Sequence, residues 1–470
     1  MDINPDAGTL TSLYPGAAVV DAHDRIIIPG FVNAHHHGES VLLGHITRRA
    51  PYALWEDLPH LGVARARLLE SSSFRDVLSL YRIAGFLHLR SGTTSVAEFP
   101  APLAPAVLEG AMDQMAASGV RSVFALQTWE QIESVRSSSP GERLYSISIG
   151  PEDGYTTYSL ESFVRASASS QYPLAAHLGE VRAGVEALRS RFKKSPLRIL
   201  KDSGVLAPSL HLIHCNHLPE NDLDIIRGGE NIVTLCVRST AAKQTGYPLL
   251  RALASRDVRI CLGTDWGGTD LLGEIRIIRN LRRYVPGTPA YGPLELIRMA
   301  TINGAHALGI AAHTGSLEVG KHADLLMIPH HDARLPALDS APDAGEIARI
   351  VTDYCDTGMI SDVMAQGVFR IRNGEPVRAD ASEILREFRR LQELYIPRGE
   401  REDDRAPGTP LAPTLQGEKT PVLGHGEMEA EGPPDQTANT SPPGTAPDAT
   451  LQKFPAATKR IGKVFGEDDV

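Results

Sequence analysis

The sequence contains little cysteine and no long apolar run. Its four cysteines, Cys215, Cys236, Cys261 and Cys355, are widely spaced and form no Cys-x-x-Cys pair. This spacing argues against a disulfide framework or a cysteine zinc knuckle, so we expect buried thiols rather than disulfides. No stretch of 18 or more apolar residues occurs. A transmembrane helix is therefore not expected.

Signals for export and for polyanionic partners are also missing. The opening stretch MDINPDAGTL has neither the basic nor the apolar region of a secretory signal, so we expect a cytoplasmic protein. The net charge is −10, but residues 401–470 hold 7 Lys and Arg against 12 Asp and Glu, a net charge of −5. Because the remainder is only mildly acidic, nothing in the charge demands a polyanionic partner, and we expect neither a nucleic-acid nor a membrane partner.

The C-terminal part differs in composition from the rest of the chain. A helix is predicted at 380–396, after which Pro, Gly, Thr, Ala and acidic residues dominate. Such a segment buries too little apolar surface to offset its chain entropy, so we expect residues 397–470 to be disordered. Its last stretch, KFPAATKRIGKVFGEDDV, mixes basic and apolar residues, and a docking peptide for another protein is one interpretation.

Short β-branched apolar runs alternate with helix-like stretches through the first 265 residues. The candidate strands cover residues 25–32, 93–99, 120–126, 145–151, 172–177, 210–215, 232–237 and 259–265. Eight such strands with intervening helices over about 250 residues favour an α/β fold of the (β/α)8 barrel type. The alternative is an open doubly wound sheet, but no Gly-x-Gly-x-x-Gly follows an early strand.

Titratable residues stand at the carboxyl ends of these strands, where barrel chemistry occurs. The stretch PGFVNAHHHGE carries three consecutive histidines, and residues two apart on a strand share a face. His35 and His37 can therefore both point to the barrel axis, with His36 pointing away. The other residues at strand ends are His177, Glu180, His214 and Asp265.

Each of these residues also has an ordinary structural explanation. His177 could be a packed histidine, Asp265 a helix N-cap and Glu180 a surface acid. Taken together these explanations fail, because titratable groups at four apolar strand ends are costly to bury without a shared purpose. Three imidazoles and a carboxylate suit Zn²⁺ or Fe²⁺.

From about residue 17 to residue 378 the sequence resembles the metal-dependent amidohydrolase superfamily. The similarity is to the branch with chlorohydrolases and with cytosine, guanine and S-adenosylhomocysteine deaminases. The motifs in order are PGFVNAHHH, LRSGTTSVAEF, HLGE, LIHCNHL, LGTD, MATINGAHALGI and TGSLEVGKHADLLMI. The resemblance implies a barrel joined to a small β-sandwich formed by both ends of the core, with one divalent metal, Zn²⁺ first and Fe²⁺ as the alternative.

The resemblance also implies a small-molecule substrate and a role for each motif residue. His35, His37, His177 and Asp265 would be the metal ligands, and His36 a bystander. Asp265 would also accept a proton from a metal-activated water, and Glu180 would carry a proton to a ring nitrogen or leaving amine. His214 would orient or polarise the electrophile; Glu180 and His214 would both contact the substrate.

The resemblance implies the following division of the chain. We expect a partial β-sandwich segment at 1–28, the metal-dependent barrel at 29–322, the β-sandwich return at 323–378, a C-terminal helix at 379–396 and the tail at 397–470. Family members have a longer first half of the sandwich, so the small domain is expected to be shortened. They are frequently oligomers, and a homo-oligomer is one expectation.

The sequence departs from the family in loops that would select the substrate. After the fourth predicted strand it reads GPEDGYTTY, where Glu152 and Asp153 would favour a basic substrate or form a solvated turn. After the seventh it reads CVRSTAAK, where Arg238 would reach an anionic substrate group or pair with a neighbouring carboxylate.

The sequence thus predicts a metal-dependent hydrolase of non-peptide carbon–nitrogen bonds. A hydrolytic deaminase of an aminated heterocycle or amidine is the first hypothesis. The alternatives are hydrolysis of a cyclic amide or an aryl chloride at the same site, and a catalytically silent scaffold barrel.

Overall fold

The computed structural model describes residues 19–47, 52, 68, 74–101, 103–138, 144–149, 160, 163–165, 173–206, 210–227, 231–337 and 342–396. Glu152 and Asp153, the expected disordered tail and its docking peptide lie outside these residues. Within the described ranges, no helix combines the length and the apolar character needed to cross a bilayer. The four cysteines are all described, all are buried, and none forms a disulfide, as predicted.

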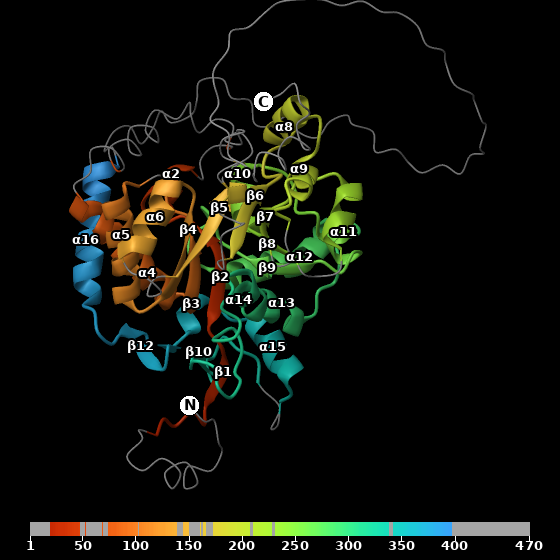
Figure 1. The fold of residues 1–470 in the computed structure, drawn as a ribbon. Coiled ribbons are helices and arrows are strands. Elements are labelled where there is room, and N and C mark those ends of the chain that lie inside the picture. Colours follow the sequence, from red (N-terminus) through yellow and green to blue (C-terminus); the bar gives the residue numbers. More distant parts are fainter. Residues whose placement is uncertain are drawn as a thin grey trace, which may run out of the picture. The chain divides into compact units, whose positions relative to one another are not determined.

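Eight parallel strands form one sheet, in which sequence neighbours are also neighbours in space (Figure 1). They are β2 (Phe31–His36), β3 (Thr93–Glu98), β4 (Arg121–Leu126), β5 (Tyr145–Ile149), β6 (Leu174–Leu178), β7 (His211–His214), β8 (Ile232–Leu235) and β9 (Arg259–Leu262). Beyond β9, the amides of Thr264 and Asp265 donate to the carbonyl oxygen of His35, at 2.9 and 2.8 Å. These bonds join the last strand to the first, and the predicted (β/α)8 barrel is confirmed.

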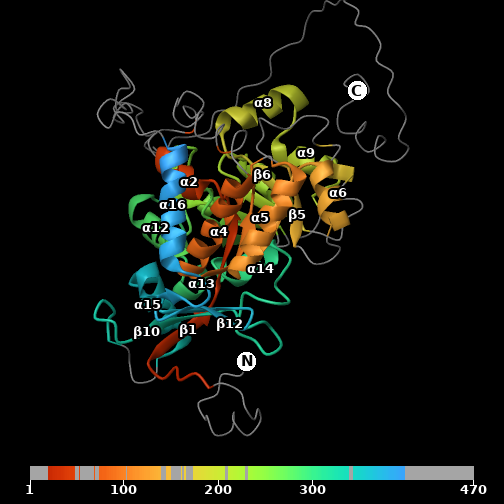
Figure 2. The ribbon, with the colours of Figure 1, turned by 90° about the vertical axis from the view of Figure 1, so that its left-hand side faces the viewer.

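Helices surround the strands (Figures 1 and 2). They are α2 (Ser40–Thr47), α4 (Phe74–Arg90), α5 (Pro105–Ser118), α6 (Trp129–Ser138), α8 (Arg182–Phe192), α9 (Pro196–Asp202), α10 (Val237–Lys243), α11 (Leu250–Ala254), α12 (Leu271–Tyr284), α13 (Pro293–Met299), α14 (Ile302–Ala307), α15 (Ala344–Asp353) and α16 (Ala381–Tyr395), with 3-10 helices η3 (Glu220–Ile226) and η4 (Thr357–Met359). Several begin where the sequence dictates. Pro196 starts α9 at a position where its missing N–H costs nothing, and the Asp270 side chain caps α12 by accepting from the Gly273 amide.

The barrel strands are buried on both faces, because helices cover the outside and side chains fill the inside. Outside, Phe31 and Phe124 belong to a large apolar cluster that also holds Tyr81 of α4. A second cluster joins strand residues such as Ala97 to Ala305 in α14. Polar groups that remain in so apolar a setting need partners, which makes those at the strand ends informative.

A separate antiparallel sheet contains both early and late parts of the chain. Its order is β1 (Arg25–Pro29), β10 (Leu325–Pro329), β11 (Asp362–Ala365), β12 (Val368–Arg372) and β13 (Glu375–Pro376). The single strand predicted at 25–32 is therefore wrong: it is two strands that belong to different sheets. The break is at Gly30, whose amide donates to the Asp324 carbonyl at 2.9 Å, while the next amide, of Phe31, donates to the Gly92 carbonyl at 3.0 Å. A side chain at Gly30 would collide with Thr94.

The predicted helix at 380–396 is confirmed as α16, which lies alongside α4 (Figure 2). Asp76 at the start of α4 accepts from Arg390 at 2.5 Å and from the Tyr395 hydroxyl at 2.6 Å. Ile384 and Leu391 pack into an apolar cluster with Leu80 and Ile83. The C-terminal part of the described chain is thus attached to the barrel by both polar and apolar contacts.

Candidate active site

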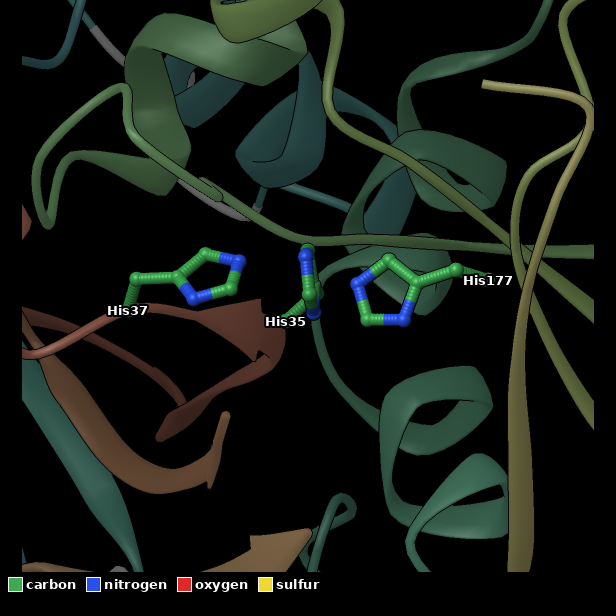
Figure 3. A group of neighbouring side chains, drawn as sticks. All are labelled: His35, His37 and His177. Carbon is green, nitrogen blue, oxygen red and sulfur yellow. The ribbon is translucent and has the colours of Figure 1, made fainter. Parts of the chain in front are cut away.

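The strand-end histidines predicted from the sequence converge at one point inside the barrel. His35 and His37 come from the end of β2, and His177 comes from β6. Figure 3 shows the ring of His35 between the rings of the other two; its centroid lies 4.9 Å from each. One nitrogen from each of the three rings lies within 4.8 Å of the others. The parallel sheet therefore brings His177 together with two residues that lie 140 and 142 positions before it in the sequence.

Asp265 and His214 complete this group. Asp265 follows β9, and its Oδ1 lies 3.5 Å from His35 Nε2 and 3.3 Å from His37 Nε2. His214 ends β7, and its ring centroid lies 5.4 Å from that of His35. Asp265 does not cap α12, because Asp270 does so. The alternative explanation of Asp265 as a helix cap is thus excluded.

Backbone conformation at two of these positions is unusual. His214 has φ of 72° and Asp265 has φ of 50°, a region that residues other than glycine seldom occupy. Such conformations persist only where the surrounding structure enforces them, and they cluster at functional sites. Here they turn two side chains toward the barrel axis at the strand ends.

Several buried polar atoms of the group lack an ordinary hydrogen bond. Among the described residues, neither ring nitrogen of His35 or His214 has a hydrogen-bond partner, and neither does Asp265 Oδ1. Unsatisfied buried polar atoms are costly, so a cluster of them fits a site at which these atoms bind a ligand. Imidazole nitrogens and a carboxylate oxygen within a few ångströms of one another form a donor set that suits a divalent transition metal.

The protonation states of His35, His177 and Asp265 suit metal binding. Burial lowers the pKa of His35 well below its usual value and that of His177 to about 3, and it lowers the pKa of His214 as well. The pKa of His37 is raised despite burial, because Asp265 stabilises its charged form. Burial alone would raise the pKa of Asp265, but the Lys243 charge and the nearby His35 and His37 rings hold it well below its usual range. Neutral imidazoles and an ionised carboxylate are the forms that coordinate metals.

Glu180 is buried within the site and is not a surface acid. Its Oε2 lies 3.5 Å from His214 Nε2, and its side chain is 5% exposed. Burial raises the pKa of this carboxyl, but the charges of His214 and Lys243 outweigh burial and lower the pKa to about 2. Glu180 is therefore an ionised side chain held beside His214.

Sequence reasoning missed Lys243 and Ser239, which lie on α10 in the CVRSTAAK segment. Lys243 Nζ donates to Glu180 Oε1 at 2.7 Å and to Asp265 Oδ2 at 2.6 Å, and the Ser239 hydroxyl donates to the same Oδ2 at 2.7 Å. Their spacing of four places both on one face of a helix directly after a strand end. This four-residue spacing after a strand end is the sequence feature that could have indicated their place in the site.

Arg238, also on α10, pairs with a neighbouring carboxylate, the second of its two expected roles. Its Nη1 lies 3.4 Å from Asp270 Oδ2, and its amide donates to Glu274 Oε2 at 3.0 Å. Glu274 is fully buried and accepts this amide at the start of α10. Contacts with α12 thus hold the position of the helix that carries Lys243.

Aromatic side chains line the site beside the histidines. Phe99, after β3, lies with its ring centroid 4.4 Å from that of His35, and Trp266 stacks on His37 at 5.7 Å. Such rings exclude water and can stack on a planar substrate.

The model of the amidohydrolase family matches residues 26–370, which is most of the chain. The chain belongs to the amidohydrolase family. The family and the hydrolase class expected from the motifs are confirmed.

Relatives within the family are distant but extensive. The 5-methylthioadenosine/S-adenosylhomocysteine deaminase of Moorella thermoacetica is 28% identical over 396 residues, which is 80% of this chain and 89% of that protein. A zinc-bound structure of an adenosine deaminase from Xanthomonas campestris matches with a TM-score of 0.68 and 21% identity, over 79% of this chain and 86% of the other. The atrazine chlorohydrolase of Arthrobacter aurescens, complexed with zinc, matches with a TM-score of 0.68 and 18% identity, over 79% and 89%.

Proposed function

We propose that this amidohydrolase is a metal-dependent hydrolytic deaminase of an amino group on a heterocyclic ring or a related amidine. The convergence of His35, His37, His177 and Asp265, with His214 and Glu180 beside them, is the observation that carries the proposal. The extensive match to a deaminase of adenosine-derived compounds supports a purine nucleoside as the first substrate class.

The proposed ligands of one divalent metal are the ring nitrogens of His35, His37 and His177 and Oδ1 of Asp265. Support comes from the atoms of His35 and Asp265 that lack hydrogen-bond partners in the described structure. Zinc is the first candidate, because it accepts this donor set and is bound in two structures with the same fold, and iron is the alternative. When bound, the metal would supply an activated water at neutral pH.

The protein residues would move protons and orient the substrate. Asp265 accepts a proton from the attacking water, because it is held ionised beside the site of attack. Glu180, which is ionised at rest, takes the other proton of the water and passes it to the ring nitrogen, and the proton held by Asp265 goes to the departing amine, which leaves as ammonia. His214, which lies 3.5 Å from Glu180, orients the carbon–nitrogen group under attack. Water adds to the ring carbon, and the carbon–nitrogen bond to the amine breaks.

The aromatic side chains beside the histidines are consistent with a planar substrate. Phe99 and Trp266 flank the histidines, and aromatic faces stack well on heterocyclic bases. Apolar walls also exclude water other than the one that reacts, which strengthens the electrostatic contacts in the site.

Ammonia release tests the proposal. Purified protein with its metal content measured would be offered aminopurine nucleosides, aminopyrimidines, pterins, aminotriazines and guanidino compounds, together with chlorotriazines and cyclic amides. Release from one subset, with the matching hydroxy product, supports the proposal. Release of chloride or of a ring-opened acid, without ammonia, would replace it by aryl-chloride or cyclic-amide hydrolysis. No turnover by folded, zinc-loaded protein on any of these classes would favour a scaffold barrel.

A further inference from the structure

Lys243 is a charged residue of the site that the family motifs did not lead us to expect. It is the last residue of α10, and its side chain is 5% exposed. Its Nζ lies 5.4 Å from the centroid of the Tyr52 ring as well as beside Glu180 and Asp265. Lysine is seldom buried unless it is paired, so its two carboxylate partners account for its position.

The ammonium group of Lys243 binds one oxygen of each carboxylate and leaves the other oxygen facing the site. Oδ2 of Asp265 accepts from both Lys243 and Ser239, which leaves Oδ1 facing His35 and His37. Oε1 of Glu180 also accepts from Lys243, and Oε2 is directed at His214. One cation thus holds one oxygen of each acid and presents the other to the site.

The helix that carries both donors is itself well anchored. Glu274 accepts from the Arg238 amide at 3.0 Å, and the Arg238 side chain lies near Asp270. Ser239 and Lys243 are four residues apart on this helix and donate to the same oxygen of Asp265. The two contacts therefore fix the orientation of the Asp265 carboxylate in addition to stabilising its negative charge.

We propose that Lys243 is a positioning residue for the reaction: it restricts Asp265 to a single metal-facing oxygen and aims Glu180 at the substrate, and in doing so it weakens metal binding. The inference rests on the proposed function for its catalytic part. Its metal part depends only on the placement of Lys243 beside Asp265.

The opposition between Lys243 and the metal follows from charge. An ammonium that lies 2.6 Å from a ligand carboxylate repels a divalent cation on the other side of that carboxylate, and burial strengthens the repulsion. Removal of the ammonium also leaves Oδ2 with the neutral Ser239 hydroxyl in place of a cation, so that the carboxylate keeps more of its negative charge for the metal. A lysine that served only to neutralise two buried acids in the folded chain would have the opposite signature, because its loss would disorder the ligand set.

Lys243→Met tests the proposal, because methionine keeps an unbranched side chain of similar length without the charge. Zinc affinity would be measured by competition with a chromogenic chelator, and turnover by ammonia release. We expect zinc to bind at least about tenfold more tightly in the variant. We expect turnover to fall by at least about 100-fold, mainly in kcat, because the acids are no longer oriented.

Two further variants separate positioning from charge. Lys243→Arg restores the cation, so zinc affinity should return to near the parent value and part of the turnover should recover. Ser239→Ala keeps the cation but removes one donor to Oδ2, so turnover should fall less than in Lys243→Met, with little change in zinc affinity. The exposed Lys201 provides a matched control, and Lys201→Met should change neither quantity.

Weaker or unchanged zinc binding in Lys243→Met would overturn the proposal, as would full turnover. If the parent releases no ammonia from any compound, the proposed function fails, yet the zinc titration still decides this inference because it needs no substrate. Should the methionine variant not fold, Lys243→Gln, which keeps a donor without the charge, would be titrated instead, with the same tighter binding expected.

Discussion

His36 Nδ1 lies 2.7 Å from Oε2 of Glu98, and both side chains are fully buried. The other oxygen of Glu98 accepts from the Gly38 amide, and the His36 ring meets that of His88, on α4, at a centroid distance of 4.3 Å. The middle histidine of the three is therefore engaged with β3 and α4. Its neighbours His35 and His37 are thereby directed to the barrel axis.

This arrangement predicts different outcomes for adjacent histidines. His36→Ala should retain nearly all bound metal but lose about 1–3 kcal/mol of unfolding free energy, because Glu98 stays buried without its partner. His37→Ala and Asp265→Ala should lose both metal and turnover. Metal analysis of the purified variants and denaturant unfolding would measure these effects.

Metal stoichiometry gives a sharper check of the same prediction. One ion per chain is expected. Loss of metal in His36→Ala together with retention in His37→Ala would contradict the prediction. It would show that His36, and not His35 and His37, points to the metal site. Two ions per chain, falling to one in His36→Ala, would assign a second ion to His36, His88 and Glu98, whose ligand atoms lie within 4.8 Å of one another.

Glu180→Gln should separate chemistry from metal binding. The substitution keeps the size of the side chain and leaves the proposed ligands intact, so metal content should not change. Turnover should fall by about 10²–10⁴-fold, because an amide cannot carry the proton. Glu186→Gln, on the exposed face of α8, is the matched control and should retain full activity. Comparable losses in both variants would remove Glu180 from its proposed role.

Much of the site followed from the sequence because parallel strands end at a common edge. His177, His214 and Asp265 are each next to an apolar strand, so their convergence needs only the barrel topology. The pairing of His35 with His37 followed from the two-residue period of a strand. These inferences required no knowledge of loop conformation.

The contacts of Lys243 and the strand break at Gly30 could not be predicted from the sequence. A lysine at the end of a short helix usually points into solvent, and only the position of α10 over the strand ends reveals its contacts with two acids. At Gly30 the apolar run RIIIPGFV is continuous, so β propensity indicates one strand. The partners on either side, β10 and β3, decide that there are two.

Glu274 predicts a pH dependence of stability. Burial raises the pKa of its carboxyl to about 8, although the Arg238 amide lowers it in part. The unfolded chain releases this proton near pH 4.5, so between pH 4.5 and 8 the folded state binds more protons than the unfolded state. The stability that the protonated side chain provides is thus complete below pH 4.5 and declines as the pH rises toward 8.

Glu274→Gln should remove this dependence. The free energy of unfolding of the variant, relative to the parent, should increase with pH across the window, by no more than about 1.4 kcal/mol per pH unit for one proton. Denaturant unfolding at several pH values between 5 and 8 would measure it. A difference that stays constant with pH would mean that the Glu274 carboxyl titrates alike in both states.

Asp324 connects the barrel with the antiparallel sheet and offers a test of stability away from the active site. Its Oδ2 accepts from Arg121, on β4, and from the Thr314 hydroxyl, each at 2.5 Å, and its Oδ1 accepts from the Gln366 amide. The side chains of Arg121 and Asp324 are 7% and 1% exposed. Removal of one partner from such a buried pair leaves an uncompensated charge.

Asp324→Ala should therefore lower the free energy of unfolding by about 3–5 kcal/mol. Glu383→Ala breaks the exposed pair between Glu383 and Arg82, and should cost no more than about 1 kcal/mol because water screens both charges. A double-mutant cycle with Arg121→Met and Asp324→Asn should give a coupling of at least about 1 kcal/mol, since the two side chains are in direct contact. Additive effects in that cycle would show that Thr314 and Gln366, rather than the ion pair, carry the contribution of Asp324.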